Sequence, residues 1–210
     1  MPKLLVEQIS APHVKGFVNE IVQRVSPSLD VDKKFVNKFF EQADRMAKNM
    51  ASLRPGRNGC VVGVAEIGEG KYDGYWELRE VGDDSGGNPQ SENELERNKI
   101  DKHTAFAVAK MSVLFGHEKF AQSSENAGLD IGEQLLISDN KNAWVIPGGA
   151  FRVGDKLIVC SGYPEAADDE AFALAMMVAC DEISKEDAIA MASGVLHNQI
   201  FEQIVDDLLK

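Results

Sequence analysis

The chain has 210 residues, of which 44% are hydrophobic, and its 34 acidic and 22 basic residues give a formal net charge of -12. This length and composition suffice for one sizeable hydrophobic core, so we expect a single domain with terminal additions. The acidic excess argues against nucleic acid or an anionic membrane surface as a partner, because both require a basic surface.

The sequence indicates neither a targeting segment nor a membrane span. The first ten residues lack the apolar stretch and the small-residue cleavage site of a signal peptide, and no run approaches about 18 apolar residues. Cys60, Cys160 and Cys180 are widely spaced and form no zinc or haem-attachment motif. We therefore predict a cytoplasmic protein with reduced, buried thiols.

Two amphipathic helices are predicted within an N-terminal extension, residues 1–58. The first covers 11–25, and the second runs from about Asp30 to Leu53, where Arg54, Pro55 and Gly56 end it. The apolar stripe of the second helix suits a cofactor or partner, but packing against a sheet or another subunit is the more ordinary explanation.

A hairpin and a helix are predicted next. Residues 60–67 and 75–81 are rich in β-forming residues and flank a glycine-containing turn, which indicates an antiparallel pair. A polar loop covers 82–89. Ser91 with Glu94 then forms a capping-box pattern for a helix that runs to about Phe115. Residues 134–138 and 143–146 have the pattern of short extended segments.

A second hairpin is predicted from 148 to 161. Its arms, 150–153 and 156–161, are joined by a two-residue turn at 154–155. The continuous apolar run in the second arm indicates a central strand that is covered on both faces. Acidic residues at 168–170 follow, where their charge suits the start of a buried helix.

The hairpin and the helix start together resemble the C-terminal half of the GlcG/HbpS-like family. The resemblance covers roughly residues 60–181 and is strongest in 148–175. It is carried by Gly148, Gly149, Gly154, Ser161, Gly162, Asp168, Asp169 and Glu170. The segment Lys102-His103-Thr104-Ala105 loosely resembles the family's Lys-Ala-x-Thr-Ala segment. The resemblance implies an α/β (α+β) fold for residues 59–181, namely a profilin-like, five-stranded, mainly antiparallel sheet with helices on both faces.

A C-terminal helix, within residues 182–210, lies beyond the family-like domain. Ser184 with Asp187 is a second capping signal, and a helical seam weakened at Gly194 runs from Ala188 to Leu208. We expect this helix to pack on the domain or on a partner subunit. Family members often form homo-oligomers, which the resemblance implies here too.

The resemblance implies that the protein binds haem or a related small anionic molecule. A neutral imidazole at His103 can ligate haem iron, although a histidine packed at a helix surface explains this residue as well. The remaining candidate ligand-binding residues are Lys102, Gly148, Gly149, Ser161 and Gly162. Their glycines bring backbone N–H groups close to an anion or simply make turns.

Two other functions stay open. One is an enzyme acting on a small metabolite through Asp168, Asp169 and Glu170, because clustered carboxylates raise one another's pKa and can serve as acid and base. Their place at a helix start is a sufficient structural reason for the same residues. The other is a structural, oligomerising subunit without a ligand, which the extra terminal helices fit. Cys160 has no basic neighbour in sequence, so we expect an inert core thiol there.

Overall fold

The computed structural model describes residues 33–56, 58–67, 74–82, 90, 99–115, 122–123, 136–138, 143–145, 148–194 and 196–210. The helices are α2 (Lys33–Leu53), α4 (Lys99–Phe115), α6 (Ala166–Ala179), α7 (Lys185–Gly194) and α8 (Phe201–Leu208). The strands are β1 (Gly59–Ile67), β2 (Gly74–Gly82), β3 (Gln122–Ser123), β4 (Leu136–Ser138), β5 (Ala143–Val145), β6 (Ala150–Val153) and β7 (Lys156–Ser161). The predicted helix at 11–25 and the capping box at Ser91 lie outside the described residues.

The sheet is antiparallel throughout and has the order β2-β1-β7-β6-β3. Both predicted hairpins are confirmed, because β1 pairs with β2 and β6 pairs with β7. The hairpins are joined through β1 and β7, and β3 adds only two residues beside β6. The mixed α/β class is therefore confirmed. Because β3 contributes only two residues, the sheet consists mainly of four strands, and the five-stranded, profilin-like arrangement stays a prediction.

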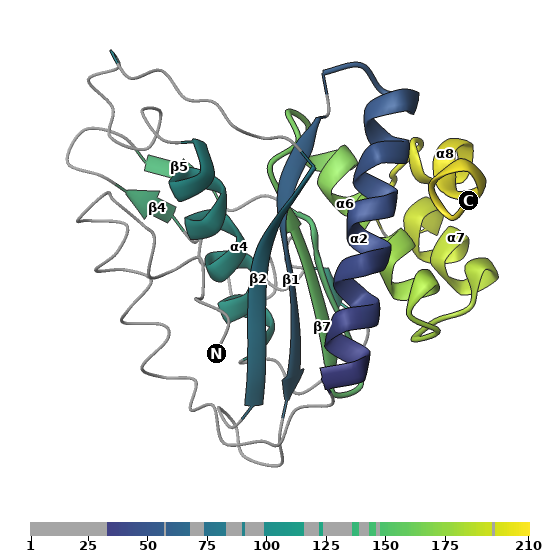
Figure 1. The fold of residues 1–210 in the computed structure, drawn as a ribbon, viewed down its shortest axis with the longest axis horizontal. Helices are drawn as coiled ribbons and strands as arrows, with labels where there is room; N and C mark the ends of the chain where they lie inside the picture. Colours follow the sequence, from purple (N-terminus) through teal and green to yellow (C-terminus); the bar gives the residue numbers. More distant parts are fainter. Residues whose placement is uncertain are drawn as a thin grey trace.

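Helices cover both faces of this sheet (Figure 1). Helix α4 packs on one face, against β1, β6 and β7, and α2 and α6 pack on the other. Side chains along β7 alternate between these two layers, and its residues from Leu157 to Ser161 are all buried. The prediction of a central strand covered on both faces is confirmed.

Helix α2 owes its position to the apolar stripe that the sequence displays. Seven of its apolar side chains are buried against the sheet and α6: Val36, Phe39, Phe40, Ala43, Met46, Ala47 and Met50. The stripe is therefore part of the core, as the packing interpretation predicted. The helix ends before Gly56, whose φ of 88° continues the chain away from the helical path.

The C-terminal region contains two helices, α7 and α8, where the sequence predicted one, so the single-helix prediction was wrong. The break falls after Gly194, and Asn198 then caps α8 by accepting hydrogen bonds from the N–H groups of Ile200 (3.0 Å) and Phe201 (3.2 Å). Figure 1 shows both helices outside α2 and α6. Asn49 of α2 donates to the Leu208 carbonyl at 3.1 Å, so this region packs on its own domain.

One smaller prediction is also confirmed. Ser184 Oγ accepts a hydrogen bond from the Asp187 N–H at 3.0 Å, which confirms the capping signal of α7. None of the described helices is long and apolar enough to cross a membrane.

Candidate functional site

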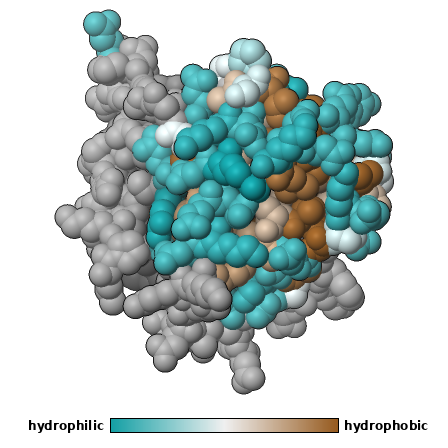
Figure 2. Space-filling view, turned by 45° about the vertical axis from the view of Figure 1, so that its right-hand side comes forward, coloured by the Kyte–Doolittle hydropathy of each residue, from teal (hydrophilic) through white to brown (hydrophobic). Residues whose placement is uncertain are grey.

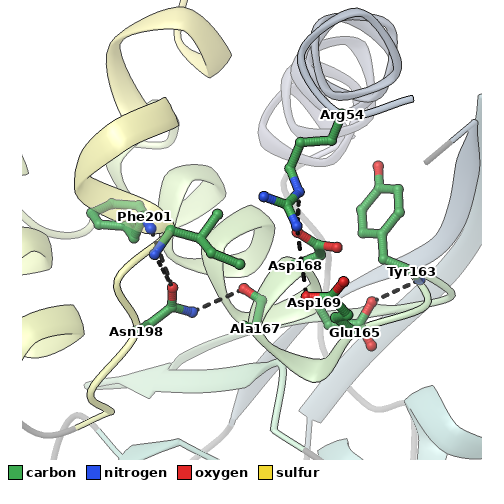
Figure 3. Close-up of polar contacts among 9 residues, drawn as sticks. Arg54, Tyr163, Glu165, Ala167, Asp168, Asp169, Asn198 and Phe201 are labelled. Carbon is green, nitrogen blue, oxygen red and sulfur yellow. Dashed lines mark hydrogen bonds and ion pairs between the residues drawn. The ribbon is translucent and has the colours of Figure 1, made fainter. Parts of the chain in front are cut away.

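At one end of the sheet, a glycine lies at the terminus of each of the four longer strands or directly next to it. Gly59 begins β1 opposite Gly82, the last residue of β2. Gly162 directly follows β7, and the Gly149 carbonyl, just before β6, accepts a hydrogen bond from the Cys160 N–H at 2.7 Å. We call this edge, defined by the four glycines, the glycine end. It brings the predicted residues of the second hairpin together with the start of α6, because the Gly162 N–H donates to Asp169. Tyr163, the next residue, lies beside the helix start in Figure 3.

Asp169 lies at the centre of this arrangement and is 4% exposed. Its Oδ1 accepts hydrogen bonds from the backbone N–H groups of Gly162 (3.1 Å) and Tyr163 (3.0 Å). The Cys160 thiol lies 3.7 Å from the same oxygen. Burial raises the pKa of Asp169 above its usual range, and Lys110 opposes the shift.

Lys110 of α4, which the sequence analysis missed, is the charged partner of Asp169. Its side chain is fully buried, and Nζ lies 2.7 Å from Asp169 Oδ2 and 2.8 Å from the Cys160 carbonyl oxygen. The pair joins helices on opposite faces of the sheet. A lone lysine among the buried residues 104–111 was the available signal, because lysine is rarely buried without a partner.

Gly149 leaves the space through which this pair forms. A β-carbon at this position would lie 2.8 Å from Asp169 Cβ, 2.8 Å from the Cys160 carbonyl oxygen and 2.9 Å from Lys110 Nζ. Its φ of 118° is also one that side chains disfavour. A β-carbon at Gly148 would likewise overlap the Glu170 carboxylate. Both glycines are thus required for the close approach of α6 to this segment as well as for a turn.

Asp168 and Glu170 have other partners. Arg54, at the end of α2, lies 2.6 Å from Asp168 Oδ1 through Nε, and its NH2 group lies 3.6 Å from the Glu165 carboxylate. Glu170 accepts a hydrogen bond from the Asn198 side-chain amide at 3.2 Å. Figure 3 shows Arg54 above the helix start and Asn198 on its far side.

The three consecutive carboxylates therefore bind three different elements. Asp168 connects α6 to α2, Asp169 connects it to α4, and Glu170 connects it to the segment before α8. All three are buried. Each carboxylate thus has its own partner, and the three partners lie in different directions from the start of α6.

Lys102 and His103 lie on the N-terminal half of α4, and both are partly exposed. His103 precedes Lys110 by two helical turns, or about 10 Å along the axis, on the same side of the helix. Lys110 contacts the end of β7, whereas the carbonyl of Leu114, one turn later, accepts a hydrogen bond from Arg152 nearer the other end of the hairpin. Helix α4 therefore runs away from the glycine end, and His103 lies toward that end. The Nε2 atom of His103 is buried.

The three cysteine thiols of the chain belong to the core. Cys60, Cys160 and Cys180 are free and buried, as predicted. Burial raises the pKa of the Cys160 thiol well above its usual value, and contact with Cys60 adds to this shift. Burial likewise raises the pKa of the Tyr163 hydroxyl. The Cys160 thiol and the Tyr163 hydroxyl therefore stay protonated at neutral pH, and Cys160 is a poor nucleophile.

Two further features complete the description. No group of three or more histidine, cysteine, aspartate or glutamate side chains among the described residues is placed to hold a metal ion. An open depression of about 430 Å³ lies between α7 and α8 and is lined by Ile189, Ala192, Ser193, His197, Asn198, Gln199, Glu202 and Gln203. Among these, Asn198 also contacts Glu170 of the predicted site.

Comparison with known proteins adds no relative. No protein-family model matches the chain, and no curated protein or solved structure matches it either. The resemblance to the GlcG/HbpS-like family therefore stays a prediction from the residues quoted above.

Proposed function

We propose that the protein binds a small anionic molecule at the glycine end of its sheet, beside the N-terminal half of α4. The observation that carries this proposal is that Gly148, Gly149, Ser161 and Gly162 lie together at one edge of the sheet. The N-terminal half of α4, which carries Lys102 and His103, lies toward the same edge. The acid–base alternative loses support, because Asp168, Asp169 and Glu170 are each held by a separate structural partner.

The ligand class follows from the charges around this edge. Lys102 is partly exposed and supplies a cation near the predicted site. Haem is the molecule that the family resemblance implies, with His103 as the iron ligand. The Nε2 atom of His103 is buried, so haem iron would reach it only after a rearrangement around this part of α4. A small carboxylate or phosphate at partly exposed Lys102 requires no such rearrangement.

A binding screen tests the proposal. The thermal midpoint and calorimetric binding of the purified protein are measured with haemin and with a panel of small carboxylates and phosphates, and haemin is also followed by its Soret absorbance. We expect saturable binding that Lys102→Ala and His103→Ala weaken. Lys48→Ala, an exposed cation on α2, is the matched control and is expected to leave binding intact.

Two results decide the matter. Binding that survives both α4 substitutions unchanged would place the ligand elsewhere on the protein. No saturable binding by any member of the panel would reject a binding function for this edge.

A structural, oligomerising role is a second candidate, because one surface favours it. Figure 2 shows apolar side chains gathered on the face that α2 and the C-terminal helices form. Partly buried apolar residues on these elements include Phe35, Ile183, Ile189, Met191, Ile200 and Leu209. Contiguous apolar surface of this kind is typical of an interface. Light scattering that gives the monomer mass of 23.0 kDa would contradict this role.

A further inference from the structure

We infer that Lys110 and the backbone N–H groups of Gly162 and Tyr163 form a carboxylate-binding site that the protein fills with its own Asp169. Once the Asp169 side chain is removed, this site takes a free carboxylate of the size of formate. We call these three donors the cradle. The inference does not depend on the proposed ligand site, because the cradle is complete within the described core.

The donors have the arrangement that a carboxylate requires. The ammonium of Lys110 lies 2.7 Å from one oxygen, and the N–H groups of Gly162 and Tyr163 lie 3.1 Å and 3.0 Å from the other. Adjacent backbone N–H groups that point to one spot bind anions, and a cation beside them strengthens the hydrogen bonds. Burial excludes the water that would otherwise weaken this binding.

The cradle belongs to elements other than α6, which contributes only the carboxylate. Lys110 comes from α4, and its Nζ stays tied to the Cys160 carbonyl without Asp169. The N–H donors follow β7, where the bond from the Cys160 N–H to the Gly149 carbonyl fixes the edge.

Helix α6 also keeps its place without this carboxylate. Asp168 still binds Arg54 and Glu170 still accepts from Asn198. Removal of the carboxylate therefore leaves the donors in position around a space of its own size.

Chemical rescue tests the inference. Asp169→Ala removes a carboxylate and leaves the β-carbon, so formate replaces what was lost. We expect a lower thermal midpoint for this variant in chloride, and a rise of about 3–6 °C when formate reaches ten times its dissociation constant. Sodium chloride at equal ionic strength serves as the reference, and benzoate, which is too large for the space, is expected to give no rise.

Two variants show whether the rescue uses the cradle. Asp169→Asn keeps the space filled with a neutral amide, so formate should raise its midpoint no more than it raises that of the wild type. A double variant with Asp169→Ala and Lys110→Met lacks the cation, and formate should not rescue it.

Three outcomes overturn the inference. One is an equal response of Asp169→Ala and wild type to formate, and another is rescue that persists without Lys110. If Asp169→Ala is unfolded in chloride, formate must restore its near-ultraviolet circular dichroism, and failure to do so also overturns the inference.

Discussion

Substitution of Lys110 by methionine isolates the contribution of the buried ion pair. Methionine keeps most of the length of the side chain and removes the ammonium, which leaves the Asp169 carboxylate without its cation in a fully buried position. Removal of one partner from a buried pair costs about 3–5 kcal/mol of unfolding free energy, because the other charge stays uncompensated. The N–H donors of Gly162 and Tyr163 remain, so we expect a loss near 3 kcal/mol at pH 8.

The loss should depend on pH in a definite direction. Burial already raises the pKa of Asp169, and Lys110 is the leading influence that lowers it, so the variant raises this pKa further. A carboxyl group whose folded pKa exceeds its unfolded value contributes stability that is full below the unfolded pKa and is lost as the pH rises through the folded pKa. The variant should therefore be less destabilised at pH 5 than at pH 8, because the raised pKa moves protonation of Asp169 to higher pH.

Urea unfolding at both pH values measures these free energies. A double variant with Lys110→Met and Asp169→Leu removes both charges and should be more stable than Lys110→Met alone. The reasoning is refuted if Lys110→Met loses less than about 1 kcal/mol, or if its loss is the same at pH 5 and pH 8.

Three further predictions concern the same end of the molecule. Gly149→Ala should lower the unfolding free energy by at least about 2 kcal/mol, because its new β-carbon overlaps the ion pair. Gly154→Ala, at φ 60° in open space, should lower it by only about 1–2 kcal/mol in the same urea assay. Asn198→Ala should lose about 2–3 kcal/mol through the α8 cap and the amide bound to Glu170, whereas exposed Gln199→Ala should change stability by less than about 0.5 kcal/mol. The Cys160 thiol, which burial keeps protonated, should react with an aromatic disulfide at pH 8 far more slowly in the native protein than in urea, and equal rates would contradict its burial.

Local signals in the sequence were sufficient for most elements. Alternating and continuous apolar patterns predicted both hairpins, and the 154–155 turn joins β6 to β7 as expected. The stripe of α2 and the Ser184 cap of α7 were readable for the same reason, since each depends on residues a few positions apart. The C-terminal break is not predictable from the apolar seam, because the seam continues beyond Gly194 and the signal for a new helix is a single residue, Asn198.

The partners of the acidic residues could not be predicted in the same way. Asp169 and Lys110 are 59 positions apart, and Glu170 and Asn198 are 28 apart. The helix dipole is a sufficient local reason for three acidic residues in a row at a helix start. Pairing across the sheet depends on how α4 and α6 sit on β7, and only the folded arrangement specifies it.

The strand order has a consequence for how the chain folds. Val61 of β1 pairs with Ser161 of β7, about 100 residues later, so neither hairpin completes the sheet alone. At roughly 5–20 residues per second, a ribosome needs on the order of 5–20 s to make the intervening chain. During that interval the inner edge of β1 has unpaired backbone groups, which is the state in which strands associate with the wrong partner. The growing chain should therefore depend most on chaperones between synthesis of the first hairpin and synthesis of the second.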